Sequence, residues 1–129
     1  MALRLSLRPN ERVIISGAVI RNGETRTELL IENKVPVLRE TDIMSPAAAR
    51  TPCERIYLAL QLMYVDPDQE AKHTTMLRTL VADVLVAAPS CRTMIEQIEA
   101  SVTDGQLYHA LKDARKLMDH ERELMTRAQ

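Results

Sequence analysis

Residues 56–65 form the most apolar stretch of the chain, since every one of them except Gln61 is apolar. A helix that is apolar on all sides has no face to present to water, so other elements must surround it. The residues before this stretch alternate as strands do, whereas those after it repeat with helical spacing. The pattern therefore predicts a central helix, preceded in the chain by strands and followed by further helices.

Both ends of the central helix carry the signals that begin and end helices. Thr51 is a suitable N-cap, Pro52 fits the first helical position, and Glu54 follows the threonine at the spacing of a capping box. Asp66–Pro67 ends the helix, because proline cannot continue it and the residue before a proline avoids helical dihedral angles. The central helix is thus predicted to lie between Thr51 and Pro67.

Four stretches in the first forty residues have strand character: residues 3–7, 12–20, 25–31 and 35–39. Leucines alternate with polar residues in the first, and β-branched residues dominate the second, in which Gly17 would mark a bulge or bend. Asn22–Gly23 is a strong hairpin signal between the second and third stretches, and Pro36 favours an edge position for the fourth. We therefore predict a small antiparallel sheet of about four strands.

After Pro67 the apolar positions follow helical spacing in three segments. Pro89 ends the first, Ser90 is suited to cap the second, and Asp104–Gly105 separates the second from the third. The predicted fold class is α+β, with an N-terminal antiparallel sheet in residues 1–44 and a C-terminal bundle of about four helices in residues 45–129. We expect one compact domain, because so small a sheet needs the helices, or a second copy of itself, to cover it.

The residues that catalysis or metal binding requires occur only at scattered positions. None of His73, His109 and His120 stands at metal-ligand spacing from another His, Cys or carboxylate, and all three are expected on helix surfaces. The three glycines form no phosphate-binding loop, and no nucleophile elbow surrounds a serine or a cysteine. We therefore expect no enzymatic activity, no cofactor and no metal site.

The two cysteines and the N-terminus bear on the cellular compartment. Cys53 and Cys91 leave two interpretations open, reduced and inert thiols or a regulatory disulfide. The first eleven residues lack the apolar core of a signal peptide, and the longest apolar run is about half of what a membrane span needs. The expectation is a cytoplasmic protein that makes no membrane contact.

Charge and aromatic content limit how this chain would meet a nucleic acid. The net charge of −1 argues against binding through bulk charge, and the absence of Trp and Phe argues against base recognition by stacking. Residues 1–51 nevertheless carry eight cations, seven of them arginine, against six anions. Arginine suits bidentate contact with phosphates and base edges. Two interpretations remain, namely solvated arginines that keep sheet edges from aggregating, or local contact with RNA.

Four segments of the chain resemble, in order, the FlbT family of flagellar regulators of alphaproteobacteria. They are LRLSLRPNERVIISGAVIRNG, LLIENKVPVLRETDIM, TPCERIYLALQLMYVDP and YHALKDARKLMDHE, and they cover most of the sequence. The resemblance implies post-transcriptional control of flagellin, in which members associate with the 5′ untranslated region of flagellin mRNA and promote its degradation or block its translation. It also implies FlaF, a second small flagellar protein, or flagellin as a protein partner.

The N-terminal strands are also similar to those of CsrA, a small β-dimer that grips RNA loops. There the first strand of one chain lies beside the last strand of its partner, and both hold the RNA. LSLRPNERVIISG corresponds to the first strand and VLRETDI to the last, and the matching positions are Leu5, Ser6, Arg8, Leu38, Arg39 and Glu40. The chain departs from that pattern at Leu7, where a second basic residue would stand, and in its added helical half.

The resulting hypothesis is a non-enzymatic regulator, in the form of a repressor, that binds flagellin mRNA through its strand half as a homodimer. The expected RNA-binding residues are Arg4, Ser6, Arg8, Arg39 and Glu40. The alternative is a protein-binding module or chaperone-like adaptor whose helical half binds flagellin or a flagellar assembly partner. A third interpretation is a scaffold held together by oligomerisation alone.

Overall fold

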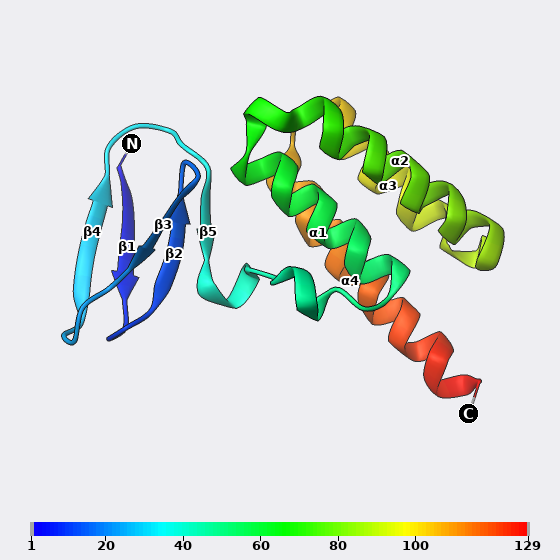
Figure 1. The fold of residues 1–129 in the computed structure, drawn as a ribbon, viewed down its shortest axis with the longest axis horizontal. Coiled ribbons are helices and arrows are strands. Elements are labelled where there is room, and N and C mark those ends of the chain that lie inside the picture. The colour runs from blue at the N-terminus through cyan, green and yellow to red at the C-terminus, as the bar shows by residue number, and fades with distance from the viewer. Residues whose placement is uncertain (1, 129) are drawn as a thin grey trace. The chain divides into compact units, whose positions relative to one another are not determined.

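The computed structural model describes residues 2–128, which form two compact units (Figure 1). The strand unit extends to Ile43, and the helical unit begins at Met44. Strands precede helices along the chain, so the α+β fold class is confirmed. None of the helices described combines the length and the apolar composition needed to cross a membrane.

The strand unit holds two antiparallel sheets rather than the single sheet predicted. Its strands are β1 (Leu3–Leu7), β2 (Arg12–Ile15), β3 (Ala18–Arg21), β4 (Thr27–Ile31) and β5 (Val37–Arg39). β1 pairs with β4 in one sheet, and β2 lies between β3 and β5 in the other. β5 has β2 as its only strand partner among the described residues, so the edge position predicted for it is confirmed.

Alternation along the strands builds the core of the strand unit. Leu5 and Leu7 of β1 are buried against Val13 of β2, while Arg4 and Ser6 of β1 are exposed. Partly buried side chains pack around this cluster from the other strands, namely Ile15, Leu29, Ile31 and Val37. The two-residue period predicted for β1 therefore places Leu5 and Leu7 inward and its polar residues outward, whereas Leu3, at the start of the strand, is exposed.

The hairpin turn lies at Ser16–Gly17 and not at Asn22–Gly23, where the sequence predicted it. Ser16 and Gly17 both have positive φ, 51° and 87°, and they form the two-residue hairpin turn that joins β2 to β3. Gly17 is thus part of a turn and not a bulge. Asn22–Gly23 makes no hairpin; the Asn22 side-chain amide instead donates to the carbonyls of Leu7 and Arg8, at 3.3 and 2.8 Å, and so ties two connecting loops together.

The helical unit contains α1 (Pro52–Val65), α2 (Glu70–Ala87), α3 (Arg92–Thr103) and α4 (Leu107–Arg127). Single 3-10 turns stand at the connections: η1 (Glu40–Asp42), η2 (Pro46–Ala48), η3 (Pro67–Gln69) and η4 (Pro89–Cys91). α1 packs against α2 and α4, and α3 packs against α4. No residue from 56 to 65 is exposed, as expected for a helix that is apolar on all sides.

The predicted start of α1 is confirmed in detail. The Thr51 hydroxyl accepts from the Glu54 backbone N–H at 3.1 Å, and a Glu54 carboxylate oxygen accepts from the Thr51 N–H at 3.0 Å. The carboxylate of Glu121, on α4, accepts from the Thr51 hydroxyl and, at 3.3 Å, from the Cys53 N–H. A distant helix therefore contributes to the cap of α1, which no local pattern predicts.

Candidate nucleic-acid interface

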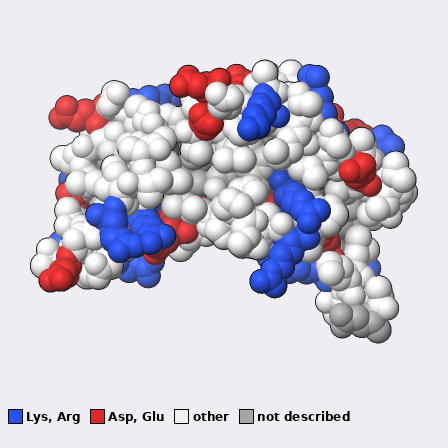
Figure 2. Space-filling model, in the orientation of Figure 1, with Lys and Arg blue, Asp and Glu red and all other residues white. Residues whose placement is uncertain are grey.

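The strand topology brings four arginines to one end of the strand unit, beside Arg26, which directly precedes β4 at the same end. β1 ends and β2 begins at this end, joined by a short loop, and β3 and β5 end there because both run antiparallel to β2. We call this region the arginine end and define it as Arg8, Arg12, Arg21 and Arg39. Figure 2 shows basic side chains gathered at the lower end of the strand unit on the visible face, beside a few acidic ones.

A buried carboxylate organises two of these arginines. Glu11 is only 3% exposed, and its Oε1 accepts from the Arg8 backbone N–H at 2.8 Å and lies 3.5 Å from the Arg8 Nε. Its Oε2 lies 3.6 Å from Nη2 of Arg39. The backbone hydrogen bond from Arg8 lowers the pKa of Glu11 despite its burial, and the charges of Arg8 and Arg39 lower it further. Glu11 is therefore ionised at neutral pH and holds both guanidinium groups.

Arg39 also joins the two sheets. Its Nη2 donates to the carbonyl of Ser6 at 2.6 Å, so a side chain from β5 contacts the backbone of β1. About half of the Arg39 side chain and more of the Arg8 side chain remain exposed. Each guanidinium carries five N–H donors, so donors remain for a ligand after the contacts with Glu11 are made.

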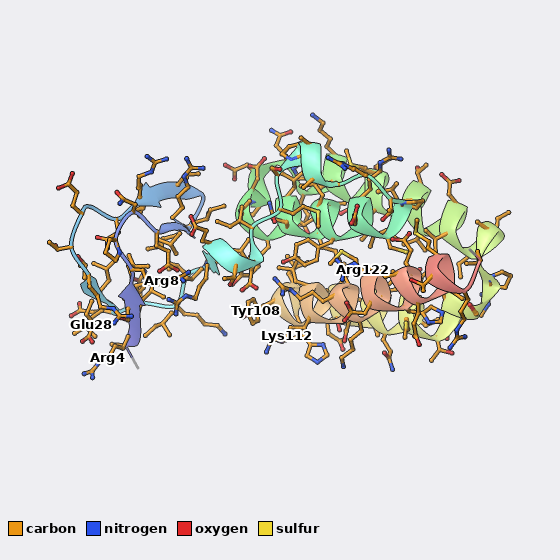
Figure 3. The ribbon with its side chains drawn as sticks, turned by 90° about the horizontal axis from the view of Figure 1, so that it is seen from below. Arg4, Arg8, Glu28, Tyr108, Lys112 and Arg122 are labelled. Atoms are coloured by element: carbon orange, nitrogen blue, oxygen red, sulfur yellow. The ribbon has the colours of Figure 1, made fainter. Side chains whose placement is uncertain are left out.

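The structure brings together most, but not all, of the residues predicted to bind RNA. Ser6, Arg8 and Arg39 meet around Glu11, whereas the Glu40 carboxylate accepts from the backbone N–H of Arg12 at 3.2 Å. Arg4 lies apart from them, on the outer face of β1, with its Nε 3.3 Å from Oε1 of Glu28 (Figure 3). Arg4 and Arg8 do not share a strand face, because Arg8 follows the end of β1.

Sequence analysis missed the other two members of the arginine end. Arg12 and Arg21 are direct partners in the β2–β3 ladder and are both exposed. Their pairing follows from the hairpin turn at Ser16–Gly17, since counting outward from that turn brings the two positions opposite each other. The Ser16–Gly17 turn is therefore the sequence feature from which the pairing of Arg12 with Arg21 could have been predicted.

The helical unit contains one cluster with the residue types of a hydrolase triad. His109 Nδ1 lies 3.0 Å from the Ser101 Oγ and 3.2 Å from an Asp113 carboxylate oxygen, and the Ser101 hydroxyl donates to the same oxygen at 3.1 Å. A catalytic histidine uses its two nitrogens for two different partners. Here both contacts fall on Nδ1, so the cluster links α3 to α4 and lacks the geometry of a proton relay.

The cysteines and His73 take buried positions in the described part of the chain. No group of three potential metal ligands comes together there. Cys53 and Cys91 are buried free thiols, and burial raises the pKa of both, with Glu121 raising that of Cys53 further. His73 is buried, with Nε2 3.4 Å from Oδ2 of Asp66, so the prediction that all three histidines lie on the surface is wrong for this residue.

Comparison with known proteins identifies the family. The family model described as flagellar protein FlbT matches residues 3–125. A probable flagellum biosynthesis repressor protein FlbT of Bradyrhizobium diazoefficiens is 47% identical over 96% of this chain and 85% of its own length. One from Rhodopseudomonas palustris is 41% identical over 98% of this chain and all of its own length. The flagellum biosynthesis repressor protein FlbT of Caulobacter vibrioides is 36% identical over 95% and 89%. No solved structure matches. The chain therefore belongs to the FlbT family of flagellar proteins.

Proposed function

We propose that this protein regulates flagellum biosynthesis as a repressor that binds the 5′ untranslated region of flagellin mRNA. Its relatives are named flagellum biosynthesis repressors, which supports the regulatory role. The observation that carries RNA binding is the arginine end, where four arginines from four parts of the strand unit converge. Binding there blocks translation of the message or directs it to degradation.

The contacts available at the arginine end suit a single-stranded RNA backbone. Arg8 and Arg39 are held in place by Glu11 yet keep exposed donors, so their orientation is established before RNA arrives. Stacking of RNA bases on aromatic side chains is not expected to contribute much to this binding. Tyr108 is the most exposed aromatic ring in the chain, and it already faces Lys112, 5.0 Å from the ring centroid, and Tyr64, 6.0 Å away. Phosphate and base-edge contacts from arginine then supply the affinity.

The test is filter binding of a flagellin leader RNA at several salt concentrations. Arg8→Ala with Arg39→Ala should weaken binding and reduce the slope of log affinity against log salt by about one per cation lost. Because these changes leave the buried Glu11 carboxylate with the Arg8 backbone N–H but no cation, a triple variant that adds Glu11→Gln removes the uncompensated charge. Arg55→Ala, an exposed arginine on α1, is the matched control. Unchanged affinity and slope in the folded triple variant would remove Arg8 and Arg39 from the site.

The alternative function, a protein-binding module for flagellin, FlaF or another assembly partner, has its own supporting observation. A groove of about 320 Å³ separates α2 from α3, and its apolar walls carry Arg78 on one side and Glu99 on the other. Such a groove suits an amphipathic helix. Co-purification of flagellin or FlaF after nuclease treatment, abolished by Arg78→Glu at the exposed edge of the groove but not by changes at the arginine end, would favour this function over RNA binding.

A further inference from the structure

We infer that Arg12 and Arg21 form a phosphate-binding clamp on the three-stranded sheet. The inference rests on the proposed function in one respect, that the phosphate belongs to an RNA backbone. The clamp is distinct from the pair held by Glu11, because Arg12 projects from the opposite face of β2 to Val13, which points into the core. Neither arginine was singled out by the sequence.

Backbone pairing places Arg12 and Arg21 opposite each other on one face of the β2–β3 ladder. The two-residue turn at Ser16–Gly17 makes Ile15 and Ala18 a hydrogen-bonded pair, and such pairs alternate with non-hydrogen-bonded ones along an antiparallel ladder. Arg12 and Arg21 are therefore a non-hydrogen-bonded pair, the kind in which side chains stand closest, with Cβ atoms about 5 Å apart.

The ladder is held on both sides of this pair. The hairpin turn closes one end, and the Asn22 backbone N–H donates to the Glu11 carbonyl at 2.8 Å just beyond the arginines. The Asn22 side chain is itself fixed by its bonds to the preceding loop. The positions of the two Cβ atoms are thus set by the backbone before any ligand binds, which reduces the backbone entropy lost on binding.

The guanidinium groups of this pair, unlike those of the neighbouring arginines, have no ionic partner among the described residues, although the Glu40 carboxylate lies beside the Arg12 backbone. Among the described residues, no carboxylate or other group forms an ion pair or hydrogen bond with either guanidinium; Glu40 contacts only the backbone N–H of Arg12. By contrast, Arg4 is paired with Glu28, and Arg8 and Arg39 share Glu11. Like charges directly opposite on neighbouring strands destabilise a sheet. An anion held between the two forks removes that repulsion and gains charge-assisted hydrogen bonds from both.

The ligand chemistry that fits is a phosphate within a polyanionic chain. Two adjacent guanidinium groups can donate to different oxygens of one phosphate, and Arg8 and Arg39 lie at the same end to meet a neighbouring one. A single free phosphate would gain only the first of these contacts. We therefore expect a phosphodiester strand to bind more tightly than inorganic phosphate.

The experiment measures binding of a single-stranded flagellin leader RNA and, separately, of inorganic polyphosphate, across a range of salt. Arg12→Ala and Arg21→Ala should each weaken RNA binding about tenfold. The double variant should fall short of the product of the two effects, because one arginine without the other no longer forms the clamp. Lys34→Ala removes an exposed cation from the loop between β4 and β5, at the other end of the strand unit. It should have a smaller effect, whereas general attraction by charge would make all single variants equal.

A stability measurement separates a binding role from a structural one. Arg21→Ala should leave the thermal midpoint unchanged or raise it, since it removes like-charge repulsion. Polyphosphate should raise the midpoint of the wild-type protein and not that of the double variant. A lowered midpoint for Arg21→Ala without ligand would indicate that the arginine stabilises the fold and would count against the clamp.

The outcomes distinguish this inference from the proposed function. If RNA binds the Arg12→Ala/Arg21→Ala variant normally but fails to bind the Arg8, Glu11, Arg39 triple variant, the clamp is wrong and RNA binding stands. Polyphosphate binding that depends on the pair, without RNA binding by the wild-type protein, would support the clamp and overturn the RNA ligand. Absence of binding to both probes would overturn both.

Discussion

Glu11 shows how one side chain controls the geometry of the candidate site. It lies in the loop between β1 and β2, follows a proline and an asparagine, and has no place in either strand pattern. Nevertheless it is the buried anion around which Arg8, Arg39 and, through Arg39, the Ser6 carbonyl are arranged. A buried carboxylate is stable only if paired and hydrogen-bonded, and here both of its oxygens have partners.

The stability that Glu11 contributes should depend on pH. Its pKa in the folded protein is lowered from an ordinary value of 4.5, so the unfolded chain binds a proton at higher pH than the folded one. The contribution is therefore fully present above about pH 5 and is lost as the pH falls through the folded-state pKa. Thermal midpoints of the wild-type protein and Glu11→Gln should differ more at pH 7 than at pH 3. An equal difference at both pH values would show that the carboxylate charge is not what stabilises the loop.

Among the secondary-structure elements, α1 depends most on a contact from elsewhere in the chain. Its capping box is local, but the Glu121 carboxylate reaches the same hydroxyl and the Cys53 N–H from α4. A negative charge at a helix N-terminus is favourable for the helix dipole. The start of α1 and the last third of α4 are thus linked at Thr51.

Removing the Thr51 hydroxyl should destabilise the protein by about 1–2 kcal/mol, because Thr51→Ala deletes the cap and one partner of Glu121. Urea unfolding measures the change. Thr79→Ala is the matched control, since this exposed threonine donates to a carbonyl within α2 and alanine is the better helix former. Combining Thr51→Ala with Glu121→Gln should cost less than the sum of the two single effects. Full additivity would indicate that the two side chains do not act together.

Of the described strands that have a free edge, β3 is the one with every residue exposed. Every residue of β3 is exposed, Val19 by 71%, and β3 pairs only with β2 among the described residues. Natural proteins shield such edges with charge, proline or a covering element. We therefore propose that a homodimer forms by antiparallel pairing of β3 with β3 of a second copy, which would join the two three-stranded sheets.

The alternation of hydrogen-bonded and non-hydrogen-bonded pairs along the β2–β3 ladder shows which substitution tests this dimer. Val19 forms a non-hydrogen-bonded pair with Ile14, so its N–H and C=O point away from β2 toward the free edge. Val19→Pro removes that outward donor without breaking the bonds between β2 and β3, and Val19→Ala keeps it. Light scattering after size exclusion should report a dimer for the wild type and Val19→Ala and a monomer for Val19→Pro. A dimer in all three would place the interface elsewhere.

Signals between near neighbours were sufficient to predict much of this fold. Four predictions depend on residues a few positions apart, and the structure agrees with each of them. They are the capping box at Thr51, the stop at Asp66–Pro67, the apolar stretch of α1 and the alternation of β1. Contacts between residues far apart in the sequence could be identified only from the folded structure. Ser16–Gly17 and Asn22–Gly23 are both plausible turns, and the choice between them depends on which strand register buries Val13 against Leu5 and Leu7.

The candidate site shows the same division. Sequence resemblance led to Arg8 and Arg39, but not to the carboxylate that holds them, nor to Arg12 and Arg21 beside them. A side chain's local preference is encoded in its neighbours along the chain, whereas its ionic partner is whichever charge the fold brings near. The distances between the arginines and their ionic partners are set by strand pairing between residues far apart in the sequence. These partners could therefore be identified only from the tertiary structure.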